Sequence, residues 1–333
     1  MSRLPVVRVN RPRDIPALDR SIVDVAVLDM NHSWPNLGHD SMIQRLADIF
    51  QEVQPRLQSA GLSFRAISYD VRRSLVIPES PGERFQLYLG TGGPGHIDPR
   101  ENDGLNEGSQ GIRENASWLD PIFDLFDSVH KDENAALISV CHTFGVLCLW
   151  SGAARPALRE SKSSGIVENE LTAEAIAHPW FSRLSRRLPD RKHLRILDSR
   201  LFDLVPANNM RNGFIAIGYG GEALTMMEFA RDRGGVMPRI FGVNHHPEIV
   251  DSPRLRKILD EKLSRNEVSK EWHEERLRAL SHDDPSQEAA LLLTSEYTHL
   301  ALIRFHLYRQ LRLRGANVHE DEVLEESRSG ERS

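Results

Sequence analysis

Residues 135–150 read AALISVCHTFGVLCLW, and this stretch decides the fold. Its first six residues form a continuous apolar run, which is typical of a strand buried on both faces of a parallel sheet. The segment at 143–150 then has apolar residues at helical spacing. Cys141 lies between the two, so we expect it at a sharp turn where a strand ends and a helix begins. Ligands of parallel α/β sheets bind at this carboxyl edge.

The same alternation of strand and helix extends to both sides of that stretch. Apolar runs predict further strands at 23–29, 62–69, 85–89, 214–219 and 239–243. One-sided apolar spacing predicts helices at 41–54 and 118–129. This order predicts an α/β fold with a doubly wound, mostly parallel sheet and helices on both faces, which is the flavodoxin-like arrangement. Between 155 and 206 only a strand near 194–197 can be placed.

The chain changes character after residue 250, where charged and helix-favouring sequence begins. Helices are predicted at 253–264, 269–280 and 285–314. The last is interpreted as packing against the sheet, with a partner or dimer surface as the alternative. The expected parts are a lead-in at 1–20, an α/β domain at 21–250, a C-terminal helical extension at 251–318 and an acidic, disordered tail at 319–333.

Composition excludes several classes of partner. The formal net charge of -6 argues against an electrostatic grip on nucleic acid. No apolar stretch approaches the roughly 20 residues needed to cross a bilayer, and the first 20 residues lack the apolar core of a signal peptide, so a cytoplasmic location is expected. Cys141 and Cys148 are too few for a disulfide framework and have no metal-ligand spacing with the histidines. We therefore expect no nucleic-acid or membrane partner, no cofactor and no metal, and we interpret Cys148 as core packing.

Two further segments follow predicted strands and have the residue types that a thiol nucleophile needs. Residues 89–99 read LGTGGPGHIDP, and glycines let backbone N–H groups approach a ligand closely, as an oxyanion hole requires. Residues 242–248 read GVNHHPE, so the carboxylate of Glu248 can orient the imidazole of His246. The start of a helix after Cys141 also favours a thiolate. Taken singly, each segment has a plain structural explanation: an inert buried cysteine, a glycine turn and a structural histidine.

In this order, the three segments resemble the class I glutamine amidotransferases. That family has a strand followed by a Gly-Gly-Pro-Gly turn, a strand ending in the nucleophilic cysteine, and a strand ending in Gly-Val-x-x-His-Pro-Glu. The matching segments are 92–95, Cys141 and 242–248. The resemblance implies a class I glutamine amidotransferase-like fold in which Cys141 is the nucleophile, His246 the base and Glu248 the carboxylate that orients the base.

The resemblance also implies an activity, namely hydrolysis of the glutamine side-chain amide through a thioester. Contacts to the oxyanion and the substrate would come from Gly92, Gly93, Gly95 and His142, the last through its backbone N–H. Ammonia would pass to a separate synthetase subunit, because the sequence has no ATP-binding signature. His245, beside the base, is interpreted as structural or orienting.

The nucleophile motif departs from the family pattern Gly-x-Cys-x-Gly-x-Gln. Thr143 replaces the second glycine and Gly145 replaces the glutamine, which puts glutamine in question as the substrate. One alternative is a homoserine O-acyltransferase-like or other acyl-transfer or hydrolase activity, since those acyltransferases resemble this fold and use Cys, His and Glu. Another is a catalytically silent binding or regulatory module. Retention of the three triad residue types speaks against the silent module.

Overall fold

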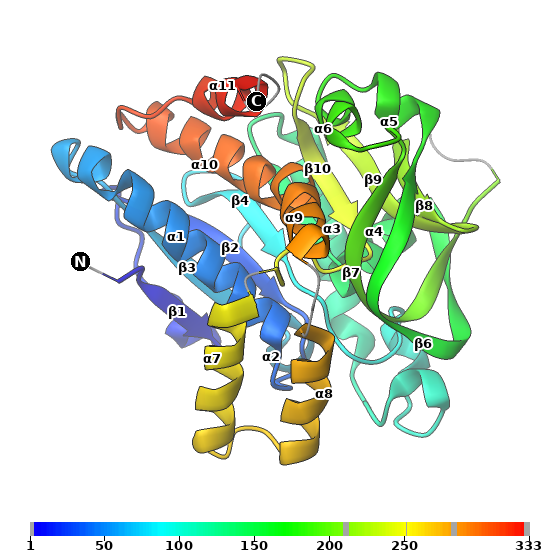
Figure 1. Cartoon of the computed structure of the whole chain (residues 1–333). Helices are drawn as coiled ribbons and strands as arrows, with labels where there is room; N and C mark the ends of the chain where they lie inside the picture. Colours follow the sequence, from blue (N-terminus) through cyan, green and yellow to red (C-terminus); the bar gives the residue numbers. More distant parts are fainter. Residues whose placement is uncertain (1–2, 209–212, 251, 281–284, 330–333) are drawn as a thin grey trace.

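The structure is a computed structural model that describes residues 3–208, 213–250, 252–280 and 285–329. Within these ranges the strands form one ten-stranded sheet in the order β1-β3-β2-β4-β5-β10-β9-β8-β6-β7 (Figure 1). The strands are β1 (Val6–Val9), β2 (Ile22–Asp29), β3 (Ser63–Asp70), β4 (Phe85–Gly90), β5 (Ala136–Val140), β6 (Ala154–Leu171), β7 (His193–Pro206), β8 (Ile215–Gly220), β9 (Ala223–Arg231) and β10 (Pro238–Val243).

The sheet has a parallel half and an antiparallel half. From β1 through β3, β2, β4 and β5 to β10, each neighbouring pair is parallel. From β10 through β9, β8 and β6 to β7, each pair is antiparallel. The predicted doubly wound α/β sheet is therefore confirmed, with its parallel strands gathered in one half, and the carboxyl edge of that half includes the ends of β4, β5 and β10. The middle of the chain differs from the expectation, because residues 154–171 and 193–206 are two long paired strands.

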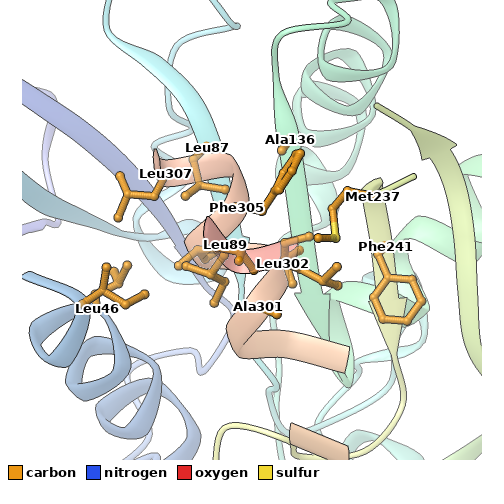
Figure 2. Packing of buried hydrophobic residues seen from close by; sticks show 14 of the residues in the cluster. Leu46, Leu87, Leu89, Ala136, Met237, Phe241, Ala301, Leu302, Phe305 and Leu307 are labelled. Atoms are coloured by element: carbon orange, nitrogen blue, oxygen red, sulfur yellow. The ribbon is translucent and has the colours of Figure 1, made fainter. Parts of the chain in front are cut away.

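Helices cover both faces of the parallel half. On one face lie α1 (Leu37–Ser59) and α10 (Ala301–Leu313), and on the other lie α3 (Leu119–Lys131) and α4 (His142–Ser151). Figure 2 shows the first face, where Leu302, Phe305 and Leu307 of α10 pack among side chains of α1, β4 and β5. The apolar spacing of the C-terminal helix is thus explained by packing on the sheet, as predicted.

The remaining helices are shorter or peripheral. They are α2 (Val71–Ser74), α5 (Ala173–Ala177), α6 (Phe181–Arg187), α7 (Ser252–Ser264), α8 (Lys270–Leu280), α9 (Pro285–Ser295), α11 (Glu320–Ser329) and the 3₁₀ turns Pro12–Asp14, Pro99–Glu101, Glu107–Ser109 and Ala116–Trp118. Helices α7 and α8 form a hairpin at the bottom of Figure 1. None of the helices in the described ranges combines the length and apolar character needed to span a bilayer.

Two C-terminal expectations need correction. Residues 320–329 do not form a disordered tail but the helix α11, because its acidic side chains have basic partners: Arg56 donates to Glu322 at 2.8 Å and Arg312 donates to Glu320 at 2.7 Å. The segment at 285–314 is not one regular helix, because a π-helical turn at Glu296–Leu300 separates α9 from α10.

Candidate active site

Cys141 lies at the turn between β5 and α4, where the sequence places it. Its backbone has φ 49° and ψ -103°, a conformation that is uncommon and strained for a residue with a side chain. The Cys141 N–H donates to the Val243 carbonyl oxygen of β10 at 2.7 Å, and its own carbonyl oxygen accepts from Gly145 N–H at 2.9 Å. These bonds hold the sharp turn. Cys148 is fully buried in the core as predicted, and burial raises the pKa of its thiol well above the ordinary value.

His246 and Glu248 follow the end of the neighbouring strand β10. His246 Nδ1 lies 2.8 Å from Glu248 Oε1, and the His246 ring lies beside the Cys141 side chain, because both approach the same point next to Gly92. Burial by itself disfavours a charged ring, but the negative charge of Glu248, the neighbouring Cys141 side chain and the hydrogen bond to Glu248 raise the pKa of His246 well above its ordinary value. The structure therefore brings the three predicted residues together, with the imidazole of His246 between the thiol of Cys141 and the carboxylate of Glu248.

The glycine-rich turn after β4 lies directly against the thiol. A Cβ atom on Gly92 would stand 3.0 Å from His246 Cε1 and 3.7 Å from Cys141 Sγ. A Cβ atom at this position would crowd the imidazole and touch the thiol, so the close approach of the turn depends on glycine.

Two backbone N–H groups near the thiol have no acceptor in the part of the chain that the structure describes. They belong to Gly93 and His142, and both residues line the same cavity as Cys141. Gly95 also lines the cavity, but its N–H already donates to Gln110 Oε1 at 2.7 Å and its φ of 80° serves the turn. The His142 ring is buried, and burial lowers its pKa well below the ordinary value, so the ring is neutral.

The cavity above Cys141 has a volume of about 310 Å³. At that size it falls at the small end of the range for small-molecule sites. Its walls include residues 34–38 at the start of α1, residues 197–202 of β7, and Trp272 and Arg276 of α8. The β7 and α8 walls cannot be recognised from the sequence, because no short motif marks them and they reach the site through long-range packing.

The two positions that depart from the family pattern have clear packing roles. The Thr143 hydroxyl donates to the Thr91 carbonyl oxygen at 2.7 Å. The side chain that replaces the family's glycine is therefore held by a hydrogen bond to the turn beside the thiol. Gly145 lies under Ile97, and a Cβ atom at 145 would stand only 2.6 Å from Ile97 Cδ1. Since Ile97 lines the cavity there, a glutamine side chain has no room at 145. Polar recognition of a substrate must come from another wall.

Comparisons with known proteins give structural likenesses only. No protein-family model and no curated protein sequence matches the chain. A glutamine amidotransferase from Thermotoga maritima is 15% identical, with 87% of this chain and 98% of that chain covered and a TM-score of 0.49. A glutamine amidotransferase from Methylobacillus flagellatus is 14% identical, with 85% and 94% covered and a TM-score of 0.49. The glutaminase domain of Trypanosoma brucei CTPS with bound acivicin is 10% identical, with 70% and 88% covered and a TM-score of 0.38.

Identities of 15% or less and TM-scores below 0.5 support no argument about activity. Any assignment of function therefore depends on the residues of the site itself. At the level of fold, glutamine amidotransferases are among the solved structures that this chain resembles.

Proposed function

We propose that this chain is a glutamine amidotransferase-like enzyme that hydrolyses the side-chain amide of glutamine with a thiol nucleophile. The observation that supports this most directly is the arrangement of Cys141, His246 and Glu248: the His246 ring lies beside the Cys141 side chain, and the last two side chains are 2.8 Å apart and only 10% and 1% exposed. A nucleophile that contacts a base, and a base oriented by a carboxylate, are the parts that covalent acyl-transfer chemistry requires.

In this proposal, His246 takes the proton of the Cys141 thiol and the thiolate attacks the amide carbon of glutamine. The new C–S bond leaves a negative charge on the amide oxygen, which the N–H groups of Gly93 and His142 stabilise. His246 then gives its proton to the amide nitrogen, the C–N bond breaks and ammonia leaves. Water, deprotonated by His246, attacks the thioester carbon, the C–S bond breaks, the Cys141 sulfur takes the proton back from His246 and glutamate is released. Glu248 stabilises the imidazolium that forms in both halves of the reaction.

A separate synthetase that consumes the ammonia belongs to the same proposal, and it follows from the resemblance in the sequence motifs. Without such a partner, the isolated chain should release ammonia to solvent. Glutamate and ammonia should then appear in equal amounts when purified protein is incubated with glutamine. Glutamate without free ammonia would contradict simple hydrolysis.

The experiment that tests the proposal is intact-protein mass measurement after exposure to a glutamine-mimicking chloroketone, with and without excess glutamine. Cys141→Ala should abolish the adduct, and Cys148→Ala is the matched control that should retain it, because Cys148 is fully buried. A single adduct that needs Cys141 and that glutamine suppresses supports the proposal. Absence of any adduct on the wild type would refute it.

One observation favours a second candidate, a homoserine O-acyltransferase-like or other acyl-transfer activity with the same nucleophile. Ile97 makes the cavity wall beside Gly145 apolar, where the family pattern has a glutamine. Labelling of Cys141 that excess glutamine does not suppress would select this candidate.

A further inference from the structure

The C-terminal helical extension is irregular at one point. A π-helical turn at Glu296–Leu300 separates α9 from α10, and the Ala301 N–H donates to the Glu296 carbonyl oxygen, five residues earlier. Turns of this kind are rare, occur mostly as single turns inside α-helices and are frequent at functional sites. The extra residue in the turn changes which side chains of the helix face inward.

Hydrogen bonds hold the π-helical turn against the loop that contains the triad carboxylate. The Ser295 hydroxyl, just before the turn, donates to the Pro247 carbonyl oxygen, and Pro247 precedes Glu248. Within the turn, the Tyr297 carbonyl oxygen accepts from Trp180 Nε1 at 2.8 Å. The turn therefore has a fixed position beside the segment that follows β10.

His299 belongs to this turn, and its ring is buried without a hydrogen bond. The residue is 0% exposed, and neither ring nitrogen has a partner in the part of the chain that the structure describes. His299 follows Ser295 by four residues, so the two side chains lie on the same side of the helix. Because Ser295 contacts Pro247, that side faces the triad loop.

Glu248 has a buried acceptor that is also unused. Its oxygen Oε1 meets His246 Nδ1 at 2.8 Å, and a Cβ atom on Gly38 of α1 would stand only 2.6 Å from it. The second oxygen, Oε2, is buried and accepts no hydrogen bond from any residue of the described ranges. A buried carboxylate oxygen without a donor costs free energy, so a neighbouring N–H would stabilise it.

The charge of Glu248 acts on the His299 ring. Burial lowers the pKa of His299 to about 4, while the negative charge of Glu248 acts in the opposite direction and Arg45 adds to the lowering. Burial also lowers the pKa of His245, a further ring near His299, well below the ordinary value. The His299 ring is therefore neutral near pH 7, with one N–H donor. A neutral donor adds no positive charge to compete with the imidazolium of His246.

We propose that His299 is a positioning residue that donates an N–H to Glu248 Oε2, directly or through one water molecule, and so fixes the carboxylate against His246. This inference rests on the proposed function, because His299 acts on the reaction only through the triad carboxylate. A carboxylate held at both oxygens keeps the orientation in which Oε1 meets the imidazole. The C-terminal extension thereby contributes a residue to a site whose other parts come from the α/β domain.

The test measures the rate at which chloroacetamide, a small uncharged probe, alkylates Cys141. His299→Leu removes the donor and should slow alkylation about 2-fold to 10-fold, which corresponds to one net hydrogen bond. His299→Asn and His299→Gln each place an amide N–H near the position of one ring nitrogen, so at least one of them should recover most of the loss. Recovery in neither variant would show that the ring only fills space, and would overturn the proposal.

His306→Leu is the matched control. His306 is also a buried histidine of the C-terminal extension, and burial lowers its pKa to about 4 as well. Its Nε2 contacts the Pro238 carbonyl oxygen at 2.7 Å, at the start of β10 and away from the end that leads to the triad. His306→Leu should leave the alkylation rate unchanged. Equal slowing in His306→Leu and His299→Leu would mean that loss of any buried histidine disturbs the site, contrary to the proposal.

A double-mutant cycle with Glu248→Ala separates the proposed role from general damage to the fold. If His299 acts through Glu248, His299→Leu should have no further effect once the carboxylate is absent. The same slowing with and without Glu248 would show that the two residues act independently, and the positioning role would be wrong.

Failure of this inference and failure of the proposed function give different results. Slow alkylation in Glu248→Ala with a wild-type rate in His299→Leu refutes the positioning role and leaves the triad. A wild type that chloroacetamide does not label at Cys141, or a wild-type rate in Glu248→Ala, refutes the proposed function and the positioning role with it. Thermal unfolding of each variant identifies a folding defect. If His299→Leu does not fold, His299→Phe, which keeps a buried ring without a donor, takes its place.

Discussion

Replacement of Glu248 by glutamine tests the proposed triad most directly. The change keeps the size of a side chain that is only 1% exposed and removes its negative charge. Its oxygen Oε1 lies 2.8 Å from His246 Nδ1, so an amide can still contact the ring. What the variant loses is the charge that raises the pKa of His246 and stabilises the imidazolium formed when Cys141 is deprotonated.

The size of the effect follows from that contact. A hydrogen bond to a charged partner contributes about 1.5 to 3 kcal/mol, against about 1 kcal/mol for a neutral one. Loss of the charge therefore costs about 0.5 to 2 kcal/mol, and since each 1.36 kcal/mol changes a rate about tenfold, it predicts a fall of about 2-fold to 30-fold in kcat/KM. The fall should appear in kcat as well, because the charge on the imidazole develops during the reaction.

The assay is glutamate release from glutamine, supported by the rate of Cys141 alkylation. The matched control is Glu228→Gln, since Glu228 is also buried and contacts a histidine, with Oε2 3.0 Å from His178 Nε2, but lies outside the cavity. Glu228→Gln should leave the alkylation rate of Cys141 unchanged. If Glu248→Gln retained wild-type kcat/KM, or if both variants lost activity equally, the carboxylate would have no specific role and the reasoning would be refuted.

Three further predictions follow from the same geometry. Because the pKa of His246 is raised in the fold, the charged ring adds stability below the unfolded pKa of about 6.5, and this stability is lost as pH rises through the folded pKa. The Tm difference between the wild type and Glu248→Gln should therefore shrink between pH 6 and pH 9. A difference that widens over this range would contradict the raised pKa. Gly92→Val should slow Cys141 alkylation at least about tenfold, because its side chain presses on both the thiol and the imidazole; an unchanged rate would show that the turn can move away. Arg72→Met should lower the free energy of unfolding by about 3 to 5 kcal/mol in denaturant titrations. The variant leaves the buried Glu114 carboxylate without its guanidinium partner at 2.6 Å, and it removes the hydrogen bond from Arg72 to the Met30 carbonyl oxygen. A loss below about 1 kcal/mol would contradict this reasoning.

The sequence predicts the parallel half of the fold because burial on both faces selects continuous apolar runs. Residues 23–29 and 135–140 have few competing interpretations, and the strands β2 (Ile22–Asp29) and β5 (Ala136–Val140) are observed there. The candidate triad is predictable for a related reason. Cys141 and His246 each follow such a strand, and the ends of neighbouring parallel strands meet at one edge of the sheet.

The antiparallel half could not be predicted in the same way. Residues 154–171 form a long strand that is mostly half-buried or exposed, and the stretch SKSSG within it has no apolar alternation. Of its partner strand at 193–206, only the part near 194–197 is predicted from the sequence, and the full length is recognised only through that pairing. Asp198 and Arg200 therefore occur in sequence as ordinary charged residues, and only their burial beside the cavity distinguishes them. The helix α11 was missed because the partners of its acidic residues lie far away in sequence, Arg56 among them.

The left-handed backbone at Cys141 means that the fold is less stable at this position than it could be. Glycine adopts φ 49° without the steric cost, so Cys141→Gly should relieve roughly 1 kcal/mol of strain while it removes the thiol. Optimising this protein for thermal stability alone would therefore favour replacing the residue on which the proposed chemistry depends. A cysteine at a position better suited to glycine lowers the stability of the fold, and a reactive role for the thiol explains why the residue is a cysteine.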